Sequence, residues 1–186
     1  SPWKNTEYNP AKVRKHRLTD EQKQAVEKIN QALKKPGFQS LLIHGITGSG
    51  KTEIYLNAID LTLKKNLSAL VLVPEISLAP QASYQFRSWF GEQVAILHSS
   101  LSNGQRFDEW RRVQTGRARV VIGTRSAVFS PLKKLGIIIV DEEHDSSYKQ
   151  EETPRYNARD VALKRGSDEK ALVILGSATP QIETYH

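Results

Sequence analysis

Six short apolar runs, separated by amphipathic segments, constrain the fold of this 186-residue chain more than any other feature. Each run is rich in Val, Ile and Leu and is followed by Gly, Pro or a polar cluster. The runs cover residues 40–45, 69–74, 94–98, 119–123, 136–143 and 171–177. Continuous apolar runs of this length are typical of parallel strands that are covered on both faces. The sequence therefore predicts an α/β fold with a doubly wound, mostly parallel sheet and helices on both faces.

The segments between these runs predict the helices that cover the sheet. The pattern indicates helices over 51–65, 79–90, 104–114 and 156–165. A further helix is expected to begin at Thr19 or Asp20, which can cap it, and to end near Pro36 and Gly37. In doubly wound sheets, ligands bind beyond the carboxyl ends of the strands. We therefore expect the functional residues just after each apolar run.

Composition narrows the class of protein. The chain has no Cys, which excludes a disulfide scaffold and a Cys-ligated zinc site within it, and no run approaches the roughly 18 apolar residues of a membrane span. The net charge of +7 favours a polyanionic partner such as nucleic acid. Residues 1–17 hold five basic residues against Glu7, a net +4, so we interpret them as a basic linker and 18–186 as one lobe. Because the chain begins at Ser1 and has no Met, we expect a fragment of a longer, soluble intracellular protein.

The segment after the first apolar run fits the P-loop pattern G-x-x-x-x-G-K-[ST]. Glycines let backbone N–H groups surround phosphates, and the following helix directs the positive end of its dipole at the same anion. Lys51 would reach the β- and γ-phosphates, and the Thr52 hydroxyl would bind Mg²⁺. A Gly-rich turn can match by chance, but a strand before and a helix after are the required context. We predict that ATP or ADP with Mg²⁺ binds Gly45, Thr47, Gly48, Ser49, Gly50, Lys51 and Thr52.

An acidic cluster, Asp141-Glu142-Glu143-His144, follows the fifth apolar run. A carboxylate at the end of an apolar strand is the Walker B arrangement, so Asp141 is predicted to hold Mg²⁺. Glu142 is predicted to activate the attacking water as a general base. The alternative is a solvated acidic turn, which the P-loop makes the weaker interpretation. Lys51, Asp141 and Glu142 are thus the predicted catalytic residues.

Further motifs occur in order along the chain. The segment 141–144 has the form of helicase motif II, 176–180 resembles motif III, 18–22 the Q-motif, 73–78 motif Ia and 122–127 motif Ib. Together they resemble the first RecA-like lobe of a superfamily 2 helicase. The strings DEEHDSSYKQEETPRYNARDVA, GITGSGKTEIY and VPEISLAPQ are similar to the family of PriA-type primosomal replication-restart helicases.

This resemblance implies an ATP-dependent 3′–5′ DNA helicase that acts in replication restart and primosome assembly in the bacterial cytoplasm. It implies that Gln22 reads adenine, and that single-stranded and forked DNA, primosome proteins and single-strand DNA-binding protein are partners. A second lobe with its arginine finger and a zinc module are expected outside this chain, which leaves the lobe alone weak or inactive in hydrolysis. Alternatives are another superfamily 2 translocase lobe, or a module that binds nucleotide and DNA without turnover. A P-loop kinase or small GTPase is disfavoured, because we find no phosphoacceptor site and no guanine-reading loop.

The resemblance also suggests DNA-contacting and coupling residues. Hydroxyls and cations at strand ends suit a sugar–phosphate backbone, so the predicted DNA contacts are Ser77, Thr124, Arg125 and Ser126. The segment after motif II resembles an aromatic-rich loop that couples DNA binding to ATP hydrolysis. Its rings would stack on bases, unless Tyr148 and Tyr156 simply pack under a surface loop. His144 is expected to hydrogen-bond Ser177 or Thr179. The predicted coupling residues are His144, Tyr148, Lys149, Arg155, Tyr156, Ser177 and Thr179.

Six arginines lie between residues 106 and 125. They could form a basic rim for DNA. The alternative is a solvated amphipathic helix whose Phe107, Trp110 and Val113 turn to the core, and we favour it for every arginine except Arg125.

Overall fold

The structure is a computed structural model, and it describes residues 17–46, 48–75 and 80–178. Most of the basic arm and three residues singled out above, Thr47, Ser77 and Thr179, lie outside the described residues.

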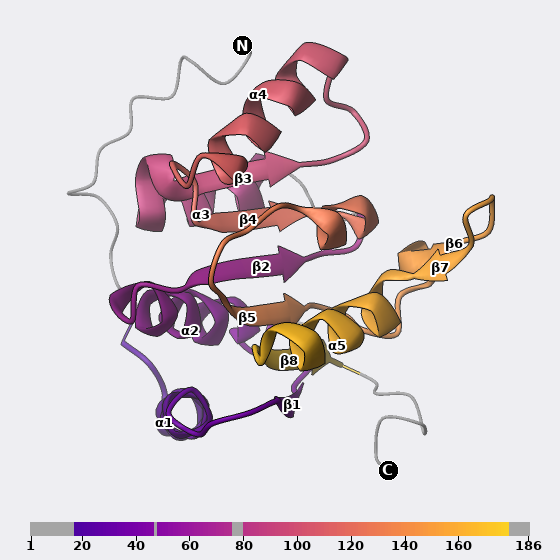
Figure 1. The fold of residues 1–186 in the computed structure, drawn as a ribbon. Helices are drawn as coiled ribbons and strands as arrows, with labels where there is room; N and C mark the ends of the chain where they lie inside the picture. The colour runs from indigo at the N-terminus through magenta and orange to yellow at the C-terminus, as the bar shows by residue number, and fades with distance from the viewer. Residues whose placement is uncertain (1–16, 47, 76–79, 179–186) are drawn as a thin grey trace.

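A six-stranded sheet in the order β1-β8-β5-β2-β4-β3 forms the centre of the described chain (Figure 1). Every neighbouring pair of these strands is parallel. The bounds are β1 (Gln39–His44), β2 (Ser68–Leu72), β3 (Val94–Leu97), β4 (Val120–Gly123), β5 (Leu135–Val140) and β8 (Leu172–Ser177). The predicted doubly wound α/β fold is confirmed.

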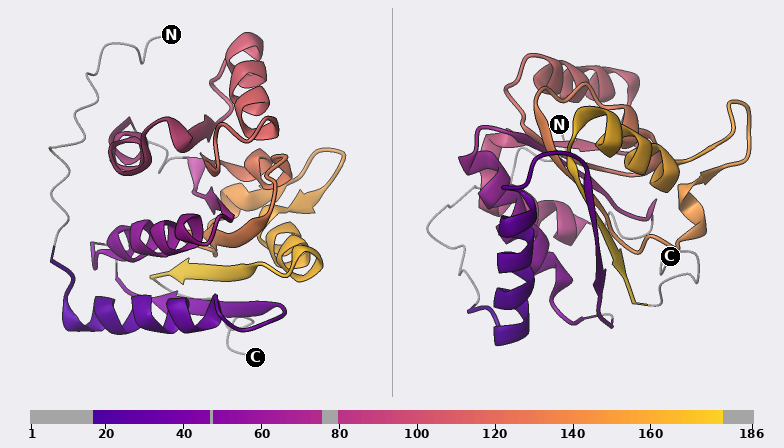
Figure 2. Two further views of the ribbon diagram at one scale, coloured as in Figure 1. Left: turned by 60° about the vertical axis from the view of Figure 1, so that its left-hand side comes forward. Right: turned by 60° about the horizontal axis from the view of Figure 1, so that its bottom comes forward.

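Helices cover both faces of the sheet (Figure 2). One face packs against α1 (Asp20–Ala32), α2 (Lys51–Lys64) and α3 (Pro80–Phe90), and the other against α4 (Asn103–Gln114) and α5 (Ala158–Glu169). Short 3₁₀ turns are η3 (Gly91–Gln93), η4 (Arg125–Phe129) and η5 (Ser146–Tyr148). Among the described residues, no helix is long and apolar enough to cross a membrane.

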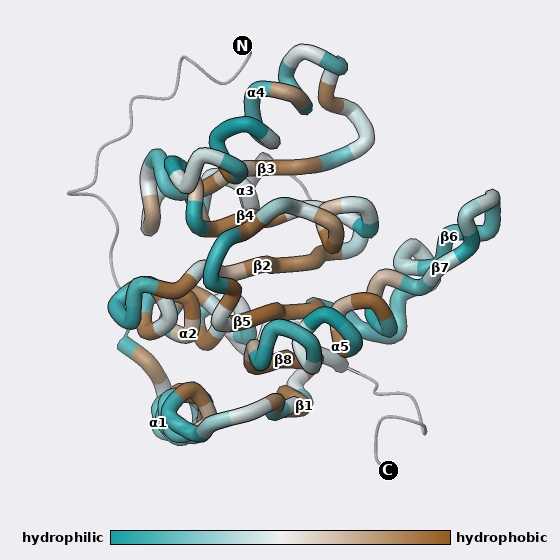
Figure 3. The backbone as a smooth tube through the Cα atoms, viewed as in Figure 1, coloured by the Kyte–Doolittle hydropathy of each residue, from teal (hydrophilic) through white to brown (hydrophobic). Residues whose placement is uncertain are grey.

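Alternate residues of each strand face the two layers of helices, because successive side chains of a strand point to opposite faces. In β2, Val71 belongs to the cluster under α1, α2 and α3, whereas Leu70 and Leu72 belong to the cluster under α4 and α5. The strands therefore appear hydrophobic along most of their length, while the helices alternate between polar and apolar (Figure 3).

The structure differs from the sequence prediction in three segments. α1 ends at Ala32, before the predicted end near Pro36, and β5 ends at Val140, so the acidic cluster lies in a turn. The segment after η5 forms an unpredicted antiparallel hairpin of β6 (Lys149–Gln150) and β7 (Tyr156–Asn157). This hairpin projects from the body at the right of Figure 1, beside the end of β5.

Candidate functional site

Three segments meet where β1, β8 and β5 end. β8 lies between β1 and β5, with His44 opposite Ser177 and Val140 opposite Leu175. The P-loop follows β1, the acidic turn follows β5, and Ser177 ends β8. Parallel strands end at the same edge of a sheet, and this is the edge where doubly wound folds bind ligands.

The P-loop combines a helix N-terminus that has no side-chain cap with the buried side chain of Lys51. Gly50 is the N-cap of α2 with φ of 80°, and it makes no side-chain cap hydrogen bond. The N–H of Glu53 donates to the carbonyl oxygen of Gly50, which leaves the N–H groups of Lys51 and Thr52 as candidate donors to an anion. The Lys51 side chain is almost fully buried. Its Nζ donates to the carbonyl oxygen of Gly45 at 2.6 Å and lies 3.2 Å from Oε1 of Glu142.

Asp141 is held by a tyrosine from α2. The hydroxyl of Tyr55, a residue only 2% exposed, donates to Oδ1 of Asp141 at 2.8 Å. Burial raises the pKa of the Asp141 carboxyl above its ordinary value. Burial, followed by the neighbouring Asp141 charge, raises the pKa of the Tyr55 hydroxyl well above its ordinary value, so Tyr55 remains a donor. Sequence reasoning missed Tyr55, because a tyrosine on a mostly apolar helix has the same pattern whether it fills the core or orients a ligand.

Glu142 joins the P-loop to the end of β8. Its backbone has a φ of 45°, a left-handed conformation, within the turn that follows β5. Its Oε1 pairs with Lys51, and its Oε2 accepts from the backbone N–H of Ala178 at 3.2 Å. The expected link from His144 is present to one of the two predicted partners, since its Nδ1 lies 3.1 Å from Oγ of Ser177.

The residues present fit a nucleotide phosphate and Mg²⁺. The donors of the P-loop and Lys51 suit phosphate oxygens, and the Thr52 hydroxyl and Asp141 carboxylate are hard oxygen ligands. Among the described residues, no group of three or more His, Cys, Asp or Glu side chains could hold a metal by itself. Mg²⁺ commonly binds through one or two protein oxygens together with substrate phosphates, and Thr52 and Asp141 would supply two such oxygens.

Gln22 connects α1 to the P-loop. Its Nε2 donates to the carbonyl oxygen of Ser49 at 3.2 Å, and its Oε1 accepts from the N–H of Thr19 in a capping box. The residue predicted to read adenine therefore lies directly against the predicted phosphate-binding loop.

Tyr148, which directly precedes the hairpin, connects it to the acidic turn. Tyr148 is 1% exposed, and its hydroxyl donates to the carbonyl oxygen of Asp141 at 2.5 Å. The prediction that this ring stacks on DNA bases does not fit this buried position, and the packing alternative describes it. Tyr156 is half-buried and packs edge-on against Phe129. Lys149 and Arg155 are exposed.

A buried ion pair and an arginine complete the attachment of the hairpin. Glu143 has no exposed side-chain surface, and its Oε2 lies 3.0 Å from Nη1 of Arg159, at the start of α5. Sequence reasoning assigned this pair no role. Arg125 Nη1 donates to the carbonyl oxygen of Lys149 at 2.6 Å. Of the other predicted DNA contacts, Thr124 is buried and Ser126 is exposed.

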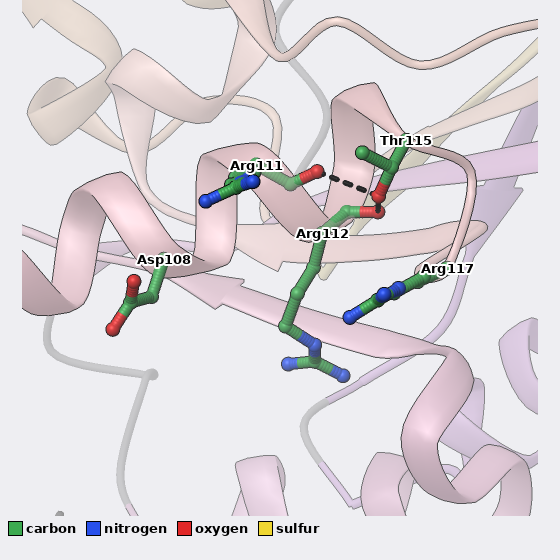
Figure 4. Close-up of a pocket in the computed structure, with 5 residues that line it drawn as sticks. All are labelled: Asp108, Arg111, Arg112, Thr115 and Arg117. Carbon is green, nitrogen blue, oxygen red and sulfur yellow. Dashed lines mark hydrogen bonds between the residues drawn. The ribbon is translucent and has the colours of Figure 1, made fainter.

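The α4 arginines have mainly structural contacts. Arg112 pairs with Glu109 at 2.8 Å and donates to the carbonyl oxygens of Glu92 and Val94. The guanidinium groups of Arg111 and Arg117 have no partner within the described part of the chain. Figure 4 shows the five residues that line a pocket at the C-terminal end of α4: Asp108, Arg111, Arg112, Thr115 and Arg117.

The expected inward face of α4 is wrong for its two aromatic residues. Phe107 is 64% exposed and Trp110 is 36% exposed, and only Val113 is buried. The helix instead turns Glu109 toward the sheet, where its carboxylate accepts from the N–H of Ile96 on the edge strand β3 at 3.1 Å.

Comparisons with known proteins identify a family and relatives that this chain resembles in sequence. The family described as the type III restriction enzyme, res subunit (ResIII), matches residues 15–182. The chain is 54% identical over 168 residues to the replication restart protein PriA of Bacillus subtilis (strain 168), and 47% identical over 178 residues to that of Haemophilus influenzae. These alignments cover 90% and 96% of this chain but 21% and 24% of the relatives. The chain thus spans about a fifth of the length of the curated relatives it matches.

Solved structures show the same fold. RecG bound to a three-way DNA junction superposes with a TM-score of 0.65 and 25% identity, over 91% of this chain and 22% of RecG. The helicase domain of Pyrococcus furiosus Hef superposes with a TM-score of 0.62 and 23% identity, over 88% of this chain and 33% of that one. The sheet with its helices is the RecA-like fold of superfamily 2 helicases. The match over residues 15–182 shows that the chain belongs to the ResIII family.

Proposed function

We propose that residues 18–186 are the ATP-binding lobe of an ATP-dependent DNA helicase of replication restart, and that residues 1–17 are a basic linker. The observation that carries this proposal is the convergence of Lys51 with Asp141 and Glu142 at the carboxyl edge of the sheet. Similarity to PriA over about 90% of this chain supports replication restart as the process.

The proposed chemistry assigns one role to each side chain. The N–H groups at the start of α2 and Lys51 bind the nucleotide phosphates, and Gln22 contacts the adenine. Thr52 and Asp141 hold Mg²⁺, which would neutralise charge that develops on the phosphates. Glu142 takes the proton of the attacking water. Lys51 now pairs with Glu142 at 3.2 Å, so phosphate binding would draw Lys51 away and free this carboxylate.

The DNA side of the proposal rests on the hairpin and its attachments. Ser126, Arg125 and the exposed Lys149 and Arg155 provide a hydroxyl and cations for a sugar–phosphate backbone. Tyr148 and the Glu143–Arg159 pair connect that surface to the acidic turn. The coupling role of Tyr148 is therefore proposed through Asp141 rather than through base stacking, and His144 with Ser177 would relay the state of Glu142.

The remaining parts of the proposal concern the longer protein. We propose that it acts on single-stranded and forked DNA in the 3′–5′ direction in the bacterial cytoplasm, with primosome proteins and single-strand DNA-binding protein as partners. Its zinc module and arginine finger would lie outside these residues. Unwinding of duplexes with a single 3′ or 5′ tail by that protein tests the direction.

Titration calorimetry with Mg·ADP tests the nucleotide site. Lys51→Ala removes a cation that would form charge-assisted hydrogen bonds to phosphate, so we expect affinity to fall about tenfold or more. Lys64→Ala is the matched control, because Lys64 lies on the same helix but pairs with Asp60 on the surface. Absence of Mg·ADP binding to the unaltered chain, or equal binding by Lys51→Ala, would contradict the proposal.

A further inference from the structure

We propose that Tyr55 is a positioning residue for the metal site, because it holds the orientation of the Asp141 carboxylate that would bind Mg²⁺. This inference rests on the proposed function, and it assigns a role to a side chain outside the P-loop and the acidic turn.

Tyr55 lies on the helix that begins at the P-loop. Residues three positions apart on a helix face the same side, so Thr52 and Tyr55 are neighbours on one face of α2. Thr52 carries the hydroxyl proposed to bind Mg²⁺, and Tyr55 carries the hydroxyl that binds Asp141 at 2.8 Å. One rigid helix thereby sets both halves of the metal site, although Tyr55 and Asp141 are 86 positions apart in sequence.

Asp141 is fixed at three points. Its N–H donates to the carbonyl oxygen of Leu72 at 2.9 Å, its carbonyl oxygen accepts from Tyr148, and its Oδ1 accepts from Tyr55. Of these three contacts, only the last one is to the side chain, and the backbone N–H of Glu142 also hydrogen-bonds the carboxylate. Tyr55 is the hydrogen-bond partner of the Asp141 carboxylate from another element, so it sets the position of the carboxylate relative to α2.

Gly176 makes the position of the Tyr55 hydroxyl possible. A Cβ on Gly176 would lie 1.8 Å from the hydroxyl oxygen of Tyr55 and 3.1 Å from Oδ1 of Asp141. No side chain fits there while the hydroxyl remains in place. Position 176 therefore requires glycine, because any side chain there would displace the Tyr55 hydroxyl that binds Asp141.

A hydrogen bond from a buried neutral donor favours the charged form of a carboxylate and holds its orientation. Without the Tyr55 hydroxyl, the Asp141 carboxylate would lose its side-chain hydrogen bond to α2, which restrains its rotation. Partners of metal ligands typically change metal affinity by about 10- to 100-fold when they are removed. The effect should therefore appear in the metal dependence of nucleotide binding rather than in nucleotide binding as such.

Tyr55→Phe tests this inference, because it removes only the hydroxyl. ADP affinity is measured by calorimetry over a series of Mg²⁺ concentrations and in excess chelator, and circular dichroism and thermal unfolding verify the fold. We expect the half-saturating Mg²⁺ concentration to rise about tenfold, with chelator-only ADP affinity unchanged within about twofold. Tyr84→Phe is the matched control, since Tyr84 is exposed on α3.

The outcomes separate the two proposals. If the unaltered chain shows no Mg²⁺-dependent ADP binding, the proposed function and this inference both fall. If it shows such binding and Tyr55→Phe has the same Mg²⁺ dependence, the proposed function stands and the role of Tyr55 is wrong. A loss of ADP affinity that is equal with and without Mg²⁺ would show that Tyr55 only supports the fold.

Gly176→Ala gives a second, independent test. Its Cβ displaces the Tyr55 hydroxyl, so we expect a rise in half-saturating Mg²⁺ similar to that of Tyr55→Phe. In the Tyr55→Phe background the same substitution should add less than about a twofold change, because the hydroxyl that it displaces is already gone. Fully additive effects of the two substitutions would overturn the inference.

Discussion

The carboxyl edge of the sheet and the α4 edge both concentrate charged residues, but they use them differently. At the carboxyl edge, contacts join residues far apart in sequence, such as Tyr55 with Asp141, 86 positions apart, and Glu142 with Ala178, 36 positions apart. At the α4 edge, the charged side chains pair with each other and with the backbone of one strand: Arg112 pairs with Glu109 three positions away, and both bind backbone groups of β3.

Charged side chains of α4 form the hydrogen bonds to the edge strand β3 that a neighbouring strand would otherwise form. β3 is the last strand of the sheet, so its outer backbone groups have no neighbouring strand. Glu109 accepts from the N–H of Ile96, and Arg112 donates to the carbonyl oxygen of Val94. Such cover satisfies the backbone and blocks pairing with another chain. Charge density alone therefore does not indicate a binding site, because the charges on α4 are used to satisfy the backbone of the edge strand.

Removal of a buried charge partner at the carboxyl edge should have the largest effect on stability. Arg159→Ala leaves the fully buried Glu143 without this partner, so we expect the free energy of unfolding to fall by about 3 kcal/mol. Arg111→Ala, at an exposed position, should change it by less than about 0.5 kcal/mol. Urea unfolding measures both variants, and equal losses would contradict the distinction between the two regions.

Removal of the Glu109 carboxylate, which binds the edge strand, should have an intermediate effect on the free energy of unfolding. Glu109→Ala leaves the N–H of Ile96 without its acceptor and Arg112 without its nearest carboxylate, so we expect a loss of about 2 kcal/mol. Asp108→Ala, one position away and exposed, is the matched control and should have little effect. If Glu109→Ala is as stable as its control, the hydrogen bond from Ile96 of β3 to Glu109 does not contribute to the free energy of unfolding.

Protonation of His98, which follows the end of β3, should have the smallest effect on stability. Burial and then the charge of Arg106 lower its pKa below the ordinary value of 6.5, and Glu75 opposes this shift. As pH falls through 6.5, the unfolded chain takes up a proton that the folded chain resists, so the folded state loses stability. Between about pH 7.5 and about pH 5, the melting temperature should fall further for the unaltered chain than for His98→Gln. A larger fall for His98→Gln would show that the sign of the pKa shift is wrong.

The positions of the six strands could be predicted from sequence, because each apolar run is followed by Gly, Pro or a polar cluster. Their order in the sheet could not be predicted, because it depends on contacts between distant segments. The end of β5 could not, since the turn at Asp141 depends on the left-handed backbone of Glu142. The face of α4 was also mispredicted. Periodicity alone does not show that the edge strand would require Glu109 rather than Phe107 and Trp110 on the inward face.

The candidate site divides in the same way. The P-loop and the acidic cluster are contiguous motifs, so Lys51, Asp141 and Glu142 could be predicted directly. Tyr55 and Arg159 could not, because each acts on a residue of another element and neither belongs to a local pattern. On a helix, a tyrosine that orients a ligand and a tyrosine that fills a core have the same sequence signature.

Nuclear magnetic resonance of the chain with ADP and Mn²⁺ in place of Mg²⁺ tests the central claim most directly, because the paramagnetic ion broadens signals near its binding site. The convergence of distant segments on Asp141 predicts strong broadening of the amide signals of Thr52, Asp141 and Ser177. The signals of Glu109 and Arg112 on α4 should remain sharp. Broadening centred on α4, or none near Asp141 while nucleotide is bound, would contradict the assignment of the carboxyl edge as the nucleotide and metal site.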